Sequence, residues 1–67
     1  MNLDPGDLVQ YRNDPGRLAI VINVDITNRG AEVCELVIVH DKDFPETVGE
    51  KRYTNQDYWR KIPQKTI

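Results

Sequence analysis

Three side chains near the middle of the chain carry groups that enzymes use for acid–base or nucleophilic chemistry. They are the only histidine, His40, the adjacent Asp41 and the only cysteine, Cys34. A histidine oriented by a carboxylate is the local arrangement of a general base, and a cysteine thiolate is a nucleophile. Catalysis also needs a substrate pocket, for which a chain of 67 residues has little interior. We therefore expect a structural or exposed His40, a small buried Cys34 and no enzymatic activity.

Carboxylates are dense in the segment that follows His40. Asp41, Asp43, Glu46 and Glu50 fall within ten residues. Oxygen ligands at alternate positions begin a calcium loop, but Pro45 and Glu46 stand where that pattern has its third acidic residue and its central glycine. The expectation is a solvated acidic loop without a metal, and a small-molecule or metal-regulated module stays open as an alternative.

An aromatic and basic cluster lies near the C-terminus. Tyr53, Tyr58 and Trp59 are interleaved with Lys51, Arg52, Arg60 and Lys61. Aromatic rings among basic side chains suit the stacking of single-stranded bases, and Tyr, Trp and Arg also dominate the hot spots of protein interfaces. One or two of the rings could instead fill the core. We expect Tyr58 to point inward and Trp59 to lie at least partly outward.

Residues 16–41 must position these groups. Two β-branched, apolar segments at residues 17–26 and 32–41 flank a polar reversal at residues 28–30, which contains Asn28 and Gly30. Asparagine and glycine favour tight reversals, and β-branched residues favour strands. The pattern predicts one long β-hairpin onto which the shorter flanking segments pack.

Both strands of this hairpin are apolar on both faces near their middles, although an antiparallel sheet with one solvated face alternates more cleanly. Either a strand bends between two packed sheets or another chain covers the outer face. We expect Ile20 to point inward, where Ile20→Ala would cost about 2–5 kcal/mol. The second apolar face, available for docking, would comprise Ala19, Val21, Val37 and Val39.

The flanking segments predict three shorter strands, at residues 7–12, 51–54 and 59–62, with a loop over 41–50 and one helical turn over 56–58. Five strands with one 3-10 turn before the last describe an all-β, five-stranded, SH3-like barrel. A chain of this length forms one domain, assigned here to residues 1–67.

Composition narrows the classes of partner. The formal net charge is −2, whereas proteins that mainly bind nucleic acid usually carry a positive excess. A single cysteine allows no internal disulfide, which favours an intracellular, cytoplasmic location. No apolar run approaches the roughly 20 residues of a membrane span, and the N-terminus does not resemble a signal peptide.

Two short stretches resemble SH3-like barrels of the KOW type. Residues 5–9, Pro-Gly-Asp-Leu-Val, are similar to the Gly-Asp-x-Val opening of those domains. Residues 16–21, Gly-Arg-Leu-Ala-Ile-Val, resemble their Gly-x-x-Gly-x-Val core, with Ala19 in place of the second glycine. Pro15 stands where many nucleic-acid-binding members have a basic residue. The layout is also similar to small stand-alone barrels of tailed bacteriophages and of photosystem I accessory subunits.

These resemblances imply a barrel that docks onto a larger protein assembly. Our expectation is a non-catalytic docking or assembly module without cofactor or metal, such as a phage structural or accessory protein located in the cytoplasm or in a virion. A KOW-like nucleic-acid-binding domain is the alternative, and a homo-oligomer stays open. The expected partner contacts are Trp59, Tyr53, Arg60, Arg52, Val21, Val37, Val39 and, in the loop, Phe44.

Overall fold

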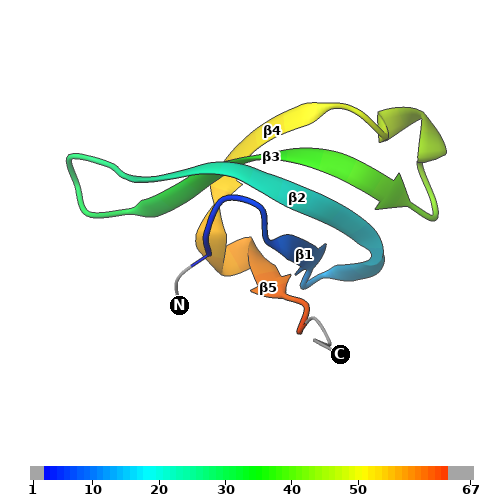
Figure 1. Cartoon of the computed structure of the whole chain (residues 1–67), viewed down its shortest axis with the longest axis horizontal. Coiled ribbons are helices and arrows are strands. Elements are labelled where there is room, and N and C mark those ends of the chain that lie inside the picture. The colour runs from blue at the N-terminus through cyan, green and yellow to red at the C-terminus, as the bar shows by residue number, and fades with distance from the viewer. Residues whose placement is uncertain (1–2, 64–67) are drawn as a thin grey trace.

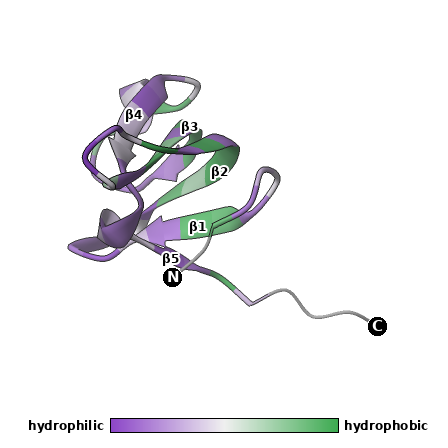
Figure 2. Cartoon of the chain, turned by 90° about the vertical axis from the view of Figure 1, so that its left-hand side faces the viewer, coloured by the Kyte–Doolittle hydropathy of each residue, from purple (hydrophilic) through white to green (hydrophobic). Residues whose placement is uncertain are grey.

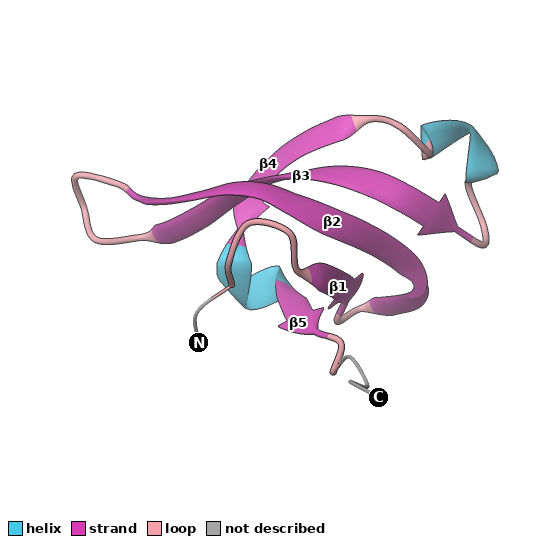
Figure 3. Cartoon of the chain, viewed as in Figure 1, coloured by secondary structure: helices cyan, strands magenta, loops and turns pink. Residues whose placement is uncertain are grey.

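The computed structural model describes residues 3–63, which form a single antiparallel β-sheet that curls over a small core (Figure 1). Its strands are β1 (Leu8–Tyr11), β2 (Asp14–Ile26), β3 (Glu32–Asp41), β4 (Lys51–Asn55) and β5 (Trp59–Lys61). Two 3-10 turns, η1 (Pro45–Thr47) and η2 (Gln56–Tyr58), precede β4 and β5 (Figure 3). Within this part of the chain, no helix has the length and apolar character needed to cross a membrane.

The strand order is β4-β3-β2-β1-β5. The all-β, five-stranded, SH3-like fold predicted from the sequence is confirmed, including the 3-10 turn before the last strand. Two details differ. β2 begins at Asp14 rather than at Arg17, and the acidic loop contains the additional 3-10 turn η1.

β2 is the central strand of the sheet and pairs with β1 on one side and with β3 on the other. Its first half pairs with β1, and from Arg17 onward it pairs with β3 along their long hairpin. The pairing with β3 is irregular between Leu18 and Ala19 and again between Val21 and Asn23. Bulges of this kind bend a strand and increase its twist. The bent β2 therefore follows the curl of a single sheet, and the two packed sheets that the sequence allowed for are not present among residues 3–63.

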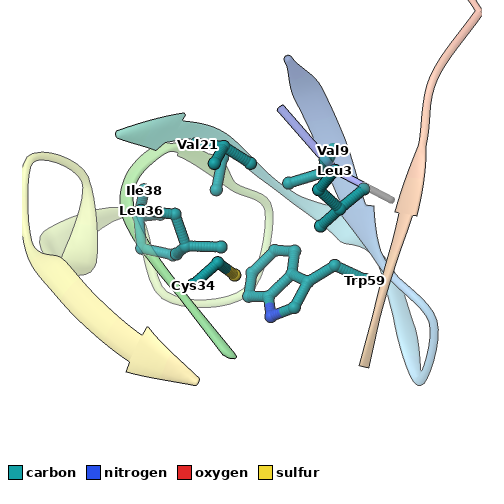
Figure 4. Close-up of a cluster of buried hydrophobic side chains, with 8 residues drawn as sticks. Leu3, Val9, Val21, Cys34, Leu36, Ile38 and Trp59 are labelled. Atoms are coloured by element: carbon teal, nitrogen blue, oxygen red, sulfur yellow. The ribbon is translucent and has the colours of Figure 1, made fainter. Parts of the chain in front are cut away.

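The core lies on the concave side of the sheet, between β1 and β5 on one side and β3 on the other (Figure 4). Its buried members are Leu3, Val9, Ala19, Val21, Cys34, Leu36, Ile38 and Trp59. Hydrophobic residues concentrate in β1, β2 and β3, whereas β4 is hydrophilic (Figure 2). The buried Cys34 agrees with the prediction of a small hydrophobe.

The inner face of β2 is the opposite of the one predicted. Ala19 and Val21 are buried, whereas Ile20 is 38% exposed. The prediction was wrong because it placed the larger side chains inside. Ala19 instead pairs with Val9 on one side and with Ile38 on the other, so a small residue fits between two larger buried ones.

Candidate functional site

An apolar surface crosses the outer side of the sheet. Leu8 pairs directly with Ile20, and Ile20 pairs with Val37. Directly paired residues project to the same side of a sheet. These three therefore form a row across β1, β2 and β3, and Lys51 continues it onto β4.

Two neighbours widen this row. Leu18 pairs with Gln10 on β1, which places it on the same outer side as Ile20. Val39 is exposed and lies at the irregularity of β3, between His40, which is opposite Leu18, and Ile38, which is opposite Ala19. We call this set the outer apolar face, and its members are Leu8, Leu18, Ile20, Val37 and Val39. Val37 and Val39 belong both to this face and to the docking face predicted from the sequence. On β2, Leu18 and Ile20 take the place of the predicted Ala19 and Val21.

Two of the predicted contact residues are in the core. Val21 is buried against Leu36, its partner on β3, and Trp59 is only 3% exposed. Tyr58, expected inside, is instead 51% exposed. The prediction for Tyr58 and Trp59 was wrong because η2 ends at Tyr58, and Trp59 then starts β5 opposite Tyr11. The Trp59 and Tyr11 rings pack with centroids 5.0 Å apart.

The other predicted contacts are accessible but divided between the two sides of the sheet. Arg52 pairs with the inward Leu36, while Arg60 pairs with the outward Gln10. Exposed Tyr53 lies on β4, and exposed Phe44 lies in the loop before η1. Only Val37 and Val39 belong to the outer apolar face, so the predicted contact set does not form one patch.

Part of the aromatic and basic cluster does come together around a pocket. The pocket has a volume of about 190 Å³ and is lined by Tyr11, Arg17, Ile38, Arg52, Tyr53, Thr54 and Trp59. We call it the donor pocket, for the hydrogen-bond donors described below. The guanidinium carbon of Arg17 lies 5.3 Å from the centre of the Tyr11 ring. Tyr11 and Arg17 were not predicted as site residues, because contacts between distant segments place them: β5 pairs with β1 and brings Tyr11 to Trp59, and Arg17 lies over the Tyr11 ring.

Arg17 is held by Asp41, whose side chain is fully buried. The Nε of Arg17 donates to Oδ2 of Asp41 over 2.8 Å. The backbone amides of Asp43 and Phe44 each donate to Oδ1 over 3.1 Å. Asp41 thus ties the start of β2 to the loop that leaves β3. An Asp at the end of a strand and before a loop is a sequence signal for such an Asx turn.

These contacts also set the protonation of Asp41. Burial on its own raises the pKa of the carboxyl, but the hydrogen bonds from Arg17 and from the two backbone amides, with the Arg17 charge, lower it below the ordinary 3.8. A lowered pKa means that the ionised carboxylate stabilises the fold. This stabilisation is complete above the ordinary pKa and is lost as the pH falls through the lower folded value.

We expect Asp41→Asn to flatten the acid dependence of stability. Thermal melts between about pH 2 and about pH 6 should show the wild-type Tm falling below about pH 4 more steeply than that of the variant. Near neutral pH the variant should melt lower, because Arg17 loses a charged partner. Asp43→Asn, which changes an exposed carboxylate two residues away, is the control and should keep the wild-type slope. Equal slopes for all three proteins would contradict the role assigned to Asp41.

The remaining candidates for chemistry are dispersed. His40 is exposed, and no hydrogen bond joins it to Asp41, whose oxygens bind Arg17 and the loop. Burial raises the pKa of the Cys34 thiol, which disfavours the thiolate needed for nucleophilic attack. Over residues 3–63, no three His, Cys, Asp or Glu side chains gather as metal ligands would.

Comparison of the chain with protein-family models, with curated proteins and with solved structures found no match. The similarity to KOW-type and phage barrels therefore stays a prediction from the short stretches that suggest it. What remains for a functional assignment is the geometry of the outer apolar face and of the donor pocket.

Proposed function

We propose that this chain is a non-catalytic docking module that binds a larger protein through its outer apolar face. The observation that supports this proposal is the row of Leu8, Ile20 and Val37 across three strands, on the side of the sheet away from the core. Full burial of a Leu, Ile or Val side chain is worth about 1.5–3 kcal/mol. The exposed parts of such a row offer a partner apolar area that the monomer itself does not cover.

The edges of the sheet favour docking through this face over the addition of a partner strand. The edge strands β4 and β5 have five and three residues. Lys51 and Arg52 lie on the first, and Arg60 and Lys61 on the second. Short edges with lysine and arginine side chains oppose pairing with another chain. A partner is therefore expected to lie flat on the sheet.

Nucleic-acid binding is less well supported. Several described basic side chains are already paired with carboxylates: Arg17 with Asp41, Arg52 with Glu50 and Lys61 with Asp7. The whole chain has a net charge of −2. A nucleic-acid-binding surface gains its affinity from many cations that together replace the counterions of the phosphate backbone, and one or two exchangeable arginines do not supply this. A structural or accessory subunit of a larger assembly, of the kind suggested by the phage resemblance, agrees better with the apolar row.

The test is a charge placed in the middle of the row. Ile20→Lys should weaken capture of the partner from a native lysate by about 100-fold or more, because docking would then bury a lysine without a carboxylate. Ile26→Lys is the matched control. It introduces the same charge at an exposed isoleucine in the same strand, in the far part of the hairpin opposite Glu32. Circular-dichroism melts should show that both variants are folded.

Nuclease treatment separates docking from nucleic-acid binding. A defined protein that survives nuclease, is retained by Ile26→Lys and is lost with Ile20→Lys supports docking through the outer apolar face. Loss of every captured species on nuclease treatment would favour the KOW-like alternative, and so would a steep decrease of binding with salt. Equal capture by Ile20→Lys and wild type would place the contact elsewhere.

A further inference from the structure

The donor pocket has an unusual balance of polar groups. Arg17, Arg52 and Trp59 side chains only donate hydrogen bonds, and the hydroxyls of the tyrosines and Thr54 can rotate to donate. No carboxylate or amide side chain lines the pocket. A ligand that matches these walls must therefore be rich in hydrogen-bond acceptors.

The indole of Trp59 supplies independent evidence for a ligand. Its Nε1 is buried, and no group within residues 3–63 accepts a hydrogen bond from it. Figure 4 shows the indole nitrogen directed away from Val9, Leu3 and Val21. A buried N–H without an acceptor is costly, and such groups are rare in folded proteins. Trp59 also lines the donor pocket, which makes a ligand held there the candidate acceptor.

The two arginines differ in how firmly they are placed. Arg17 is fixed through its Nε by the buried Asp41 and lies over the Tyr11 ring, and neither contact uses its terminal nitrogens. Arg52 donates from one terminal nitrogen to Glu50 over 2.6 Å, but both side chains are about half exposed. Exposed ion pairs contribute little, so Arg52 can exchange Glu50 for a ligand at small cost.

We propose that the donor pocket binds a carboxylate, presented by an acidic side chain or by the C-terminus of a peptide. The guanidinium group matches the two oxygens of a carboxylate. Trp59, whose N–H lacks an acceptor within residues 3–63, lines the same pocket. A volume of about 190 Å³ corresponds to roughly six waters, enough for one short side chain or chain end.

The charges of the other grooves also favour the donor pocket as the place for an anion. Two larger grooves, which share Val24 and Asp25, have volumes of about 420 and 410 Å³. They are lined by no lysine or arginine, and their carboxylates are Asp4, Asp25, Glu32 and Glu35. An acidic ligand is repelled there and accepted at the donor pocket. This inference does not depend on the outer apolar face, because the pocket and the face share no residue.

The single tryptophan makes the test direct. The Trp59 indole N–H gives one cross-peak in a proton–nitrogen correlation spectrum of the full chain. Three short peptides are titrated: one with an internal glutamate and an amidated C-terminus, one without acidic residues but with a free C-terminus, and a neutral one with glutamine and an amidated C-terminus. Inorganic phosphate is the fourth probe.

A saturable downfield shift of this cross-peak with either carboxylate peptide, and none with the neutral one, supports the proposal, and the peptide that binds identifies the source of the carboxylate. Arg52→Gln should weaken binding at least tenfold, whereas Arg60→Gln, an equal charge change outside the pocket, and Ile20→Lys should leave it unchanged. The proposal is overturned by an equal shift with the neutral peptide, by no saturable shift with any peptide, or by a response to phosphate alone.

Discussion

Trp59→Ala is expected to remove most of the stability of this fold. Trp59 is 3% exposed and packs against Tyr11 at the pairing of β5 with β1. Replacing a buried tryptophan with alanine costs about 3–5 kcal/mol, since the cavity refills only in part. A domain of 67 residues, at roughly 0.05–0.15 kcal/mol per residue, has a total of about 3–10 kcal/mol. The variant should therefore be largely unfolded or melt far below the wild type.

The adjacent residue is the control. Tyr58 is 51% exposed, so Tyr58→Ala should change the free energy of unfolding by less than about 1 kcal/mol. Trp59→Phe should lie between the two, because it retains an aromatic ring and removes a donor that has no acceptor within residues 3–63. Urea denaturation followed by circular dichroism measures all three. A stable Trp59→Ala together with a strongly destabilised Tyr58→Ala would restore the orientation expected from the sequence.

The architecture could be predicted because local patterns determine it. The β-branched segments on either side of Gly30 specify the β2–β3 hairpin, and Gly30 does adopt a positive φ of 83° at the reversal. The short β4, the turn η2 and β5 follow from their own residues in the same way. Each of these elements is encoded by neighbours in the chain, and their succession is enough to indicate the barrel.

The orientation of side chains could not be predicted, because it depends on partners far away in the sequence. Ala19 is buried since Val9 and Ile38 lie on either side of it, and nothing in residues 17–26 alone shows this. With apolar residues on both faces, the choice between Ile20 and Val21 for the interior reduces to register. The predicted docking face therefore had the correct strands but the wrong residues on β2.

Only part of the donor pocket could be predicted from the sequence, because its other residues are brought in by contacts between distant segments. Arg52, Tyr53 and Trp59 are close in sequence, so their clustering could be expected. Arg17 reaches them from β2, and its position requires Asp41 at the end of β3. A contact over 24 residues leaves no periodic signal. The feature that distinguishes the pocket, a buried Trp59 N–H without an acceptor, is a property of packing and not of sequence.

Leu36→Ala is expected to lower the stability more than Ile20→Ala does, whereas Ile20→Ala is expected to weaken docking more. Leu36 is fully buried between Val21 on β2 and Arg52 on β4, so its truncation should cost about 2–5 kcal/mol. Ile20 is 38% exposed on the outer apolar face, and Ile20→Ala should cost less than about 1 kcal/mol. This revises the larger cost expected from the sequence, which assumed that Ile20 points inward.

Partner capture should show the reverse order where both variants are folded. Ile20→Ala removes apolar surface at the centre of the proposed contact and should weaken capture by about tenfold, or roughly 1.4 kcal/mol. Leu36→Ala, measured at low temperature where enough of it is native, should bind in proportion to its folded fraction, because Leu36 does not reach the outer side. If Ile20→Ala lowered stability as much as Leu36→Ala, Ile20 would belong to the core, and the outer apolar face would lose its central residue.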